Sequence, residues 1–327
     1  MSSDAEWAWR LLRVFVLRRL APIWRFVAPV VPYVAFLLTV VTVLGAGVGQ
    51  VVPGDDPPLS SYWRGWTFAV PLLSILLAHE FGHYFAARFH GVPASLPVFL
   101  PMPWSPFGTF GAVIGMPDRI ASRRALLDIG AAGPLAGMVL AIPILAYGLT
   151  LSDVRPLDPH GLMEGQSLLY LLMKRVFVGV IQPGHDVFLH PVAFAGWTGL
   201  FITMINLLPV GQLDGGHVAY ALFGEKQDAY GARIRTALLP LCGINLVRNL
   251  WPVYRAGWEA EAAKLAITNS LFWLFWFVLL GGLLWLSGGK HPPVDDGEKL
   301  GPVRRVIAVG SLVLFVLLFM PAPLTVQ

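Results

Sequence analysis

Two histidines and a glutamate stand close together in SILLAHEFGHYFAARFH, residues 74–90. His79 and His83 are four residues apart, so on a helix they lie on one face, where two imidazoles can bind one metal ion. Glu80 is turned by roughly 100° from His79, so it can reach a metal-bound water without ligating the ion. The pattern H-E-x-x-H is typical of zinc hydrolases, in which zinc acidifies a water and the glutamate acts as general base.

A catalytic zinc ion takes three protein ligands and keeps one position for water. The segment NLLPVGQLDGGH, residues 206–217, offers Asp214 as the third ligand, after a helix break expected at Pro209 and Gly211. Two glycines follow Asp214 and allow the backbone to approach a neighbouring segment closely. Taken alone, Asp214 can also mark a membrane–water interface. The single cysteine, Cys242, excludes an internal disulfide and a multi-cysteine zinc site.

The composition is that of a membrane protein. Hydrophobic residues make up 56% of the 327 residues and charged residues 13%, whereas about a quarter of a soluble domain is charged. Five stretches contain no Asp, Glu, Lys or Arg: 26–54, 129–152, 191–213, 265–289 and 306–327. A sixth, 65–87, contains only Glu80. Because about 20 helical residues cross a bilayer, the sequence predicts an all-α polytopic membrane protein with about six transmembrane helices.

The positively charged residues predict an orientation. Five arginines precede the first apolar stretch, and the positive-inside rule then places the N- and C-termini in the cytoplasm of a multi-pass cell-membrane protein. Spans two and four both run inward, so the histidines and Asp214 are expected at one depth near the cytoplasmic side. Residues 290–305 fall on the outer side and oppose this assignment with four Lys and Arg. The net charge of +4 is explained by such residues and requires no nucleic acid.

Ionisable groups inside a span are costly and functional by default, and a bound cation offsets the cost of these. One alternative to a hydrolase is a membrane transporter or channel with a buried His/Asp cation site. Glu80 discriminates between them, because only the hydrolase requires it as a base that does not ligate. An inactive scaffold is disfavoured since every catalytic position is intact.

HEFGH followed by NLLPVGQLDGG resembles the site-2 protease family of intramembrane zinc metalloproteases, over residues 65–220. The resemblance implies one Zn²⁺ per chain bound by His79, His83 and Asp214, Glu80 as catalytic base, and Asn206 contacting substrate or the oxyanion. GAAGPLAG, residues 130–137, resembles the family's glycine–proline segment and is assigned to helix packing. Residues 153–190 are too few for the PDZ domain that many family members carry, and the CBS domains of other members are also expected to be missing.

Residues 91–118 are apolar but contain six prolines and four glycines, so they cannot form a plain helix. The piece FGTFGAVIGM is compatible with a short strand or hairpin, and the resemblance implies a membrane-embedded β-hairpin or loop after the H-E-x-x-H helix. An exposed strand edge there can hold an extended substrate segment by β-augmentation. The remaining alternative is a surface loop that caps the site.

Three regions are expected: 1–64, a basic N-terminal segment and first transmembrane helix; 65–220, a zinc metalloprotease membrane core; and 221–327, a cytoplasmic segment and two C-terminal transmembrane helices. The implied partner is a single-span or signal-anchor membrane protein in the lipid bilayer; the oligomeric state is not determined. Residues 167–181 are expected to form an interfacial helix. The histidines outside the motifs are expected to be solvated, and His217 to support Asp214 at most.

Overall fold

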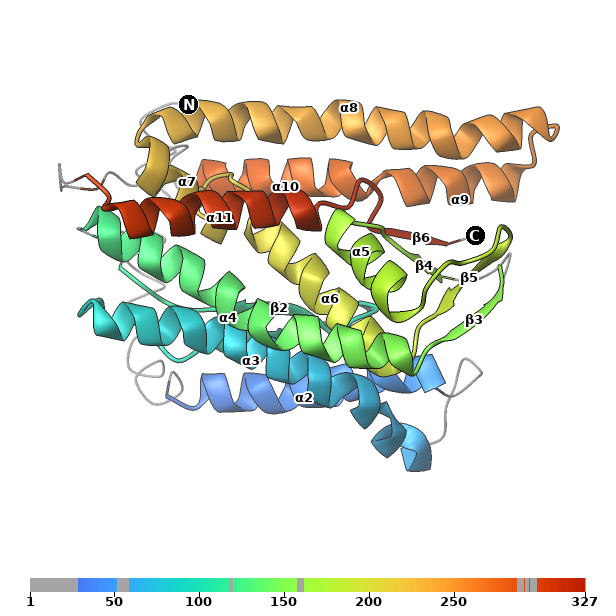
Figure 1. The fold of residues 1–327 in the computed structure, drawn as a ribbon, viewed down its shortest axis with the longest axis horizontal. Helices are drawn as coiled ribbons and strands as arrows, with labels where there is room; N and C mark the ends of the chain where they lie inside the picture. The colour runs from blue at the N-terminus through green and yellow to red at the C-terminus, as the bar shows by residue number, and fades with distance from the viewer. Residues whose placement is uncertain are drawn as a thin grey trace, which may run out of the picture.

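The structure is a computed structural model that describes residues 29–51, 59–117, 120, 122–157, 162–286, 291, 294 and 299–326. The predicted basic segment at the N-terminus, residues 1–25, lies outside the described residues. Most of the described chain is helical. The helices run side by side along the long axis of the molecule (Figure 1).

Three helices are long and apolar enough to cross a membrane: α2 (Val31–Val51), α3 (Trp66–Phe89) and α4 (Arg123–Thr150). A fourth is obtained if α9 (Ala260–Ser270) and α10 (Phe272–Leu286), bent by 41°, form one span. The apolar helix α6 (Pro191–Asn206) and helix α11 (Pro302–Leu318) are shorter. Each of the six predicted stretches therefore contains a helix, and the chain is a membrane protein; six crossings stay a prediction.

Helix α4 packs against both α3 and α6, and glycines permit the close approach. A Cβ on Gly82 of α3 would lie 2.6 Å from the carbonyl oxygen of Ala132 in α4. A Cβ on Gly196 of α6 would lie 2.7 Å from the backbone of Leu145. Small residues at helix contacts are typical of membrane proteins, where dispersion contacts between closely packed helices replace the hydrophobic effect.

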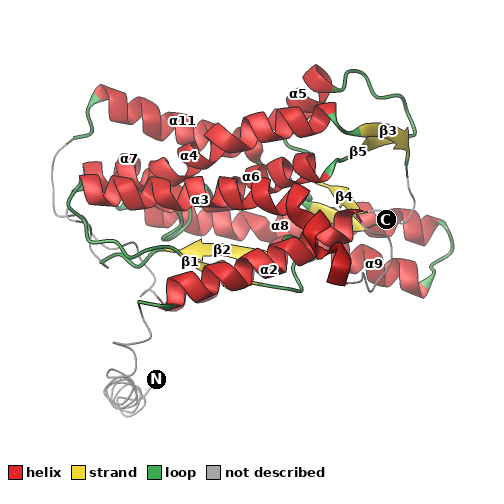
Figure 2. Cartoon of the chain, turned by 90° about the horizontal axis from the view of Figure 1, so that it is seen from below, coloured by secondary structure: helices red, strands yellow, loops and turns green. Residues whose placement is uncertain are grey.

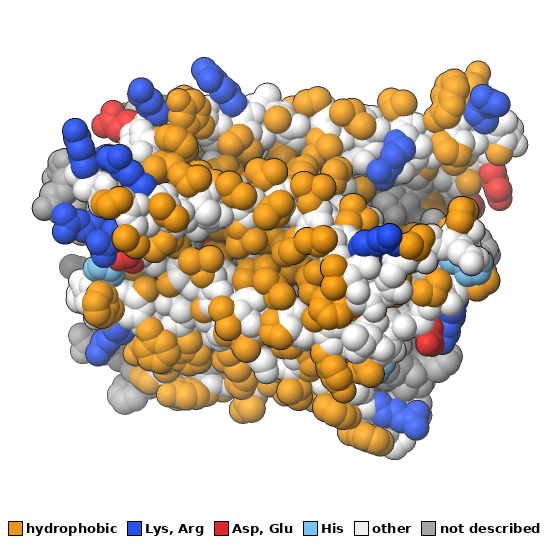
Figure 3. Space-filling view, viewed as in Figure 1, with side chains coloured by type: hydrophobic (Ala, Val, Ile, Leu, Met, Phe, Trp, Pro, Cys, Tyr) orange, Lys and Arg blue, Asp and Glu red, His pale blue; other side chains and the backbone are white. Residues whose placement is uncertain are grey.

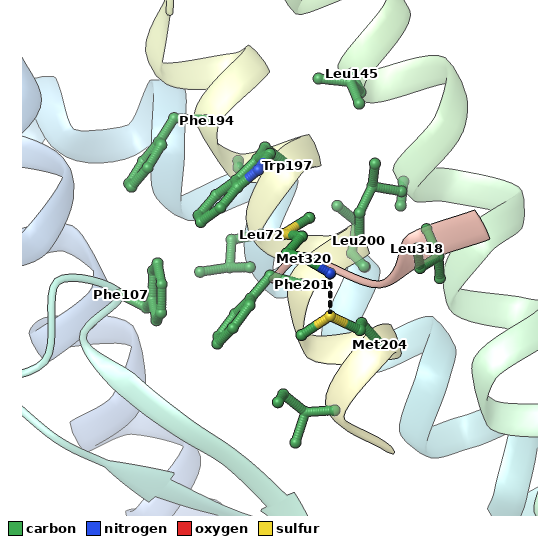
Figure 4. Packing of buried hydrophobic residues seen from close by; sticks show 14 of the residues in the cluster. Leu72, Phe107, Leu145, Phe194, Trp197, Leu200, Phe201, Met204, Leu318 and Met320 are labelled. Carbon is green, nitrogen blue, oxygen red and sulfur yellow. Dashed lines mark hydrogen bonds between the residues drawn. The ribbon is translucent and has the colours of Figure 1, made fainter. Parts of the chain in front are cut away.

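Aromatic rings fill the space between α6 and the loop before β2. Phe194, Trp197 and Phe201 stack along α6, and Phe107 contacts all three rings (Figure 4). The chain after α11 also enters this core, where the backbone N–H of Met320 donates to Sδ of Met204 at 3.1 Å. The C-terminal segment is thus an integral part of the packing.

Strands β1 (Val98–Pro101) and β2 (Thr109–Val113) form an antiparallel hairpin after α3. The hairpin lies along α2 (Figure 2). Gly108, at φ +73°, sits so close to the carbonyl oxygen of Thr42 in α2 that no side chain fits there. β1 packs on α2, and no strand among the described residues pairs with the other edge of β2. A hairpin is present where the sequence favours one; its depth in a bilayer stays a prediction.

The 3-10 helix η1 (Leu59–Gly65) directly precedes α3, and the connection between α4 and α6 contains helix α5 (Leu168–Phe177). Its strands pair as β3 (Asp153–Pro156) with β5 (His185–Phe188), and β4 (Leu162–Glu164) with β6 (Leu324–Val326). Lys174 of α5 is buried and contacts Asp186 at 2.7 Å and Glu164 at 3.5 Å. Burial raises the pKa of Glu164. The helix lies where the interfacial helix is expected, and its interfacial position stays a prediction.

Helix α8 (Lys226–Arg255) corrects the expected course of the chain. Its 30 residues span about 45 Å and run beside the other helices (Figure 1). The segment 214–264, predicted to remain on one side, therefore reaches from one end of the bundle to the other. Lys and Arg recur along α8, so it contains no uncharged run of the length expected for a span.

This course reverses the predicted placement of the last helix. We call the end of the bundle where α3 ends and α4 begins the metal end. Arg304 at the start of α11 contacts Asp128 of α4 at 2.7 Å, so α11 begins at the metal end. β6 pairs with β4 at the opposite end. Two predictions are therefore wrong: that residues 290–305 lie opposite to residues 88–128, and that the chain ends on the side where α2 begins.

Candidate metal centre

Helix α3 carries His79, Glu80 and His83 as buried side chains, each less than 10% exposed. α6 ends at Asn206, the chain breaks its helix through Leu207–Leu213, and α7 (Asp214–Phe223) begins with Asp214. The expected break at Pro209 and Gly211 is therefore present. Gly215 and Gly216 pack directly on the carbonyl oxygens of Leu207 and Gly211, so a side chain at either position would collide with the preceding turn.

The three predicted ligands meet although Asp214 is more than 130 residues from the histidines. The Nε2 atoms of His79 and His83 are 3.1 Å apart. Oδ2 of Asp214 lies 3.3 Å from Nε2 of His79 and 3.2 Å from Nε2 of His83. The three donor atoms thus form a nearly equilateral triangle.

This triangle fits a zinc ion. Bonds of ~2.0–2.1 Å at the tetrahedral angle separate neighbouring donor atoms by about 3.3–3.4 Å, close to the separations of 3.1–3.3 Å found here. Two imidazole nitrogens and one carboxylate oxygen are also donors that zinc binds. Both histidines are buried, whereas Asp214 is partly exposed. The residues are therefore able to hold one zinc ion and leave a fourth position open.

The two imidazoles are oriented differently. Nδ1 of His83 donates a hydrogen bond to the carbonyl oxygen of Ile129 in α4 at 2.7 Å. That bond leaves the lone pair of Nε2 directed at the triangle, as metal-binding histidines require. Nδ1 of His79 is buried beside Gly137 of α4 and has no hydrogen-bond partner among the described residues. The ring of His79 is thus held by packing, and that of His83 by a hydrogen bond.

The small residues of GAAGPLAG surround these rings. A Cβ on Gly133 would collide with Nε2 of His83, and one on Gly137 would lie 3.3 Å from Cβ of His79. A Cβ on Gly130 would lie 2.9 Å from Cβ of His217. The segment serves packing, as predicted, and the packed groups are the ligand side chains and their neighbour on α7.

A cavity of about 460 Å³ opens onto the triangle. Glu80 lines it, as do the three ligand side chains and Ala112–Ile114 of the hairpin. The amide Nδ2 of Asn206 is 3.2 Å from Nε2 of His79, so Asn206 also faces the centre. A carboxylate, an amide and a strand edge consequently surround the space next to the metal position.

Three other histidines differ from the sequence expectation. His217 bonds His291 rather than Asp214, with Nδ1 and Nε2 2.8 Å apart. His291, expected in solvent, is buried and stacks on Tyr220. His90, also expected in solvent, bonds Asp128 at 2.8 Å. The sequence did not indicate these partners, because the bonded residues are 38 and 74 positions apart and local spacing carries no information on such contacts.

Comparison with known proteins gives consistent results. Peptidase family M50 matches residues 67–242. The chain is 30% identical to the probable zinc metalloprotease EGY1, chloroplastic, of Oryza sativa subsp. japonica, over 91% of this chain and 51% of that protein. It is 32% identical to the EGY1 protein of Arabidopsis thaliana, over 62% and 41%, and 29% identical to its EGY2 protein, over 76% and 40%.

The chain thus spans about half, or less, of the length of these relatives. The family match contains both predicted motifs, the histidines of α3 and the aspartate of α7, together with the intervening helices that bring them into contact. The family matches more than half of the chain, and the similarity to the Oryza EGY1 protein covers nine-tenths of the chain. The chain therefore belongs to peptidase family M50.

Proposed function

We propose that the chain is an intramembrane zinc metalloprotease that hydrolyses peptide bonds within or near transmembrane segments of membrane proteins. The observation that carries the proposal is the triangle of His79, His83 and Asp214 beside Glu80. Both histidines and Glu80 belong to α3, a helix long and apolar enough to cross a membrane. The relatives are named as probable zinc metalloproteases, and these names support zinc as the ion. They do not favour the transporter alternative.

Each side chain has a proposed role. His79, His83 and Asp214 bind one zinc ion, which when bound acidifies a water molecule. Glu80 takes the proton from the attacking water and later donates it to the amine nitrogen that leaves when the C–N bond breaks. Asn206 is placed to donate from Nδ2 to the carbonyl oxygen of the scissile bond, where negative charge develops.

The hairpin is the proposed binding surface for the substrate. Backbone groups at the free edge of β2 can pair with an extended segment, and Ala112–Ile114 place that edge at the cavity next to Glu80. An extended conformation is required because the peptide bonds of a helix are shielded. The proposed substrate is therefore a single-span or signal-anchor protein with a segment that unwinds readily.

We propose that the six predicted stretches cross the bilayer as α2, α3, α4, α6, α9–α10 and α11, with the hairpin embedded between them. Helix α8, which runs parallel to them, is a seventh crossing. With α8 included, Lys299, Arg304 and Arg305 lie at the metal end, and the loop that opposed the positive-inside assignment now supports it. The active site then faces the cytoplasmic side, in the cell membrane; the relatives are named chloroplastic.

We divide the chain into three functional regions. Residues 1–64 contain the first crossing helix, residues 65–220 contain the catalytic core with both motifs, and residues 221–327 supply the helices that follow. In the proposed topology the last region contains α8 as a further crossing, in place of the cytoplasmic segment that the sequence favours.

Glu80→Gln tests the activity. In proteoliposomes with a single-span substrate, this variant should cleave about 100- to 10,000-fold more slowly, because it lacks the general base. Its zinc content should remain near one per chain, because Glu80 is not a ligand. Glu261→Gln, at an exposed position on α9, is the matched control and should cleave normally.

Two results would overturn parts of the proposal. Loss of zinc from Glu80→Gln would make Glu80 a ligand and remove it as the base. Absence of cleavage by zinc-loaded wild-type protein, across a set of single-span substrates, would reject the protease function. Comparison of membrane proteomes with wild-type and Glu80→Gln protein then identifies natural substrates as proteins truncated only in the former.

A further inference from the structure

One carboxylate at the metal end joins three helices. Arg304 in the first turn of α11 donates from Nε to both oxygens of Asp128, at 3.0 and 3.1 Å, and from Nη2 to Oδ2 at 2.7 Å. His90, directly after α3, bonds the same Oδ2 at 2.8 Å. Asp128 itself belongs to α4. The end of α3 and the starts of α4 and α11 are therefore held at one point.

Asp128 lies next to the backbone carbonyl that orients the proposed metal ligand His83. Asp128 immediately precedes Ile129, whose carbonyl oxygen accepts the hydrogen bond from Nδ1 of His83 at 2.7 Å. A shift of the first turns of α4 would move that oxygen and release the imidazole ring. The groups that accept such hydrogen bonds fix ring orientation and ligand basicity, and their loss typically costs ~10–100-fold in metal affinity.

The connection before α11 contacts the helix of the third ligand as well. His291 bonds His217, which follows Asp214 by one turn of α7. The ring of His291 stacks on Tyr220 with centroids 4.0 Å apart, and its backbone N–H donates to Asp228 at 3.0 Å. The connection that leads into α11, the helix of Arg304, therefore also packs on α7.

Apolar packing supports the same arrangement. A buried cluster separate from the main core gathers under the metal end, with Leu126 and Ile129 from α4 and Val218 from α7. Leu300 and Ala308, on either side of Arg304, are buried in this cluster. Arg304 is consequently anchored by its neighbours in position to hold Asp128.

We propose that Arg304 is a positioning residue of the metal centre, acting through Asp128 and the carbonyl of Ile129 on His83. The proposal rests on the proposed function of His79, His83 and Asp214 as metal ligands. Arg304 lies outside residues 67–242, the part that matches the family. The last helix thus does more than fill space around the core: it completes the surroundings of a ligand.

The test measures zinc affinity of the full-length chain in detergent, by competition with a chromophoric chelator. Arg304→Gln should bind zinc about 10-fold more weakly. Arg304→Lys should recover part of the loss, because it keeps the charge but not the bidentate geometry. Arg305→Gln removes the neighbouring, exposed charge and should bind zinc like wild type.

A double-mutant cycle distinguishes positioning from general electrostatics. Asp128→Asn should weaken zinc binding about as much as Arg304→Gln, and the double variant should lose no more than either single variant, since both act through one contact. Losses that add in the double variant would overturn the proposal. So would an Arg304→Gln affinity within twofold of that of Arg305→Gln.

Asn245→Ala is the control for lost stability. It removes a buried hydrogen bond to the carbonyl oxygen of Pro321 and should lower the melting temperature without changing zinc affinity. A zinc affinity reduced as in Arg304→Gln would assign the effect to destabilisation and reject the positioning role. If wild-type protein binds no zinc, the proposed metal centre itself fails, which separates that outcome from failure of this inference alone.

Discussion

At the scale of residues, a small set of polar groups is concentrated where water is scarce. Burying His79, His83 and Asp214 without a partner would cost several kcal/mol, and their mutual distances of 3.1–3.3 Å leave a shared cation as the natural compensation. Glu80 faces the same cavity without belonging to the triangle. This geometry supports the proposed division into three ligands and one base.

Asp214→Ala removes one of the three donors and should weaken zinc binding at least about 100-fold, the upper limit expected for loss of an outer partner. His79→Ala and His83→Ala should have similar effects. The measurement is chelator competition in detergent, with Asp153→Ala, an exposed carboxylate at the opposite end, as the control. Unchanged zinc affinity in Asp214→Ala would show that the aspartate is not a ligand.

At the scale of elements, α4 shapes the centre although it supplies no ligand. Its glycines face the rings of His79 and His83, and its Ile129 carbonyl orients one of them. A helix with larger residues on this face would displace α3. A helix without a ligand of its own is thus the template on which the two histidines are arranged.

Gly133→Ala tests this role, because the added Cβ would collide with Nε2 of His83. Overpacking of this kind typically costs ~1–3 kcal/mol, so zinc affinity should fall roughly 5- to 150-fold. Gly243→Ala on α8 is the matched control, since a Cβ there meets nothing within 4 Å, and it should bind zinc normally. Equal affinities of the two variants would contradict the close packing of α4 on His83.

At the scale of the whole molecule, the course of α8 determines where everything after it lies. The outward face of α8 exposes Ile244, Val247 and Trp251, apolar residues that suit contact with lipid. Lysines and arginines gather toward the two ends of the molecule and leave an apolar band between them (Figure 3). This surface supports the proposal that α8 is among the helices that cross the bilayer.

Labelling with a membrane-impermeant thiol reagent tests the crossing of α8. In a Cys242→Ser background, Glu225→Cys and Lys299→Cys should be labelled from one side of sealed vesicles, and Glu259→Cys from the other. An α8 confined to one side would instead give Glu225→Cys and Glu259→Cys the same accessibility and Lys299→Cys the opposite one. Labelling of all three after permeabilisation is the control for folding and exposure.

The sequence alone determined the features that local spacing encodes. His79 and His83 share a helix face because four residues make about one turn, and the lengths of uncharged runs located the apolar helices. The break before Asp214 and the close packing after it followed from Pro209 and the glycines at 211, 215 and 216, whose backbone preferences are local. The family resemblance rested on these same residues.

Only the tertiary structure decided which distant residues meet. The bonds between Asp128 and Arg304 join positions 176 residues apart, and nothing in either neighbourhood indicates the other. The course of α8 along the bundle was hidden from the sequence because its arginines interrupt the apolar run. Helices packed beside α8 cover part of its surface. The positions of α11 and of β6 are set by their contacts with α4 and β4. Hydropathy along one segment does not indicate such contacts between distant segments.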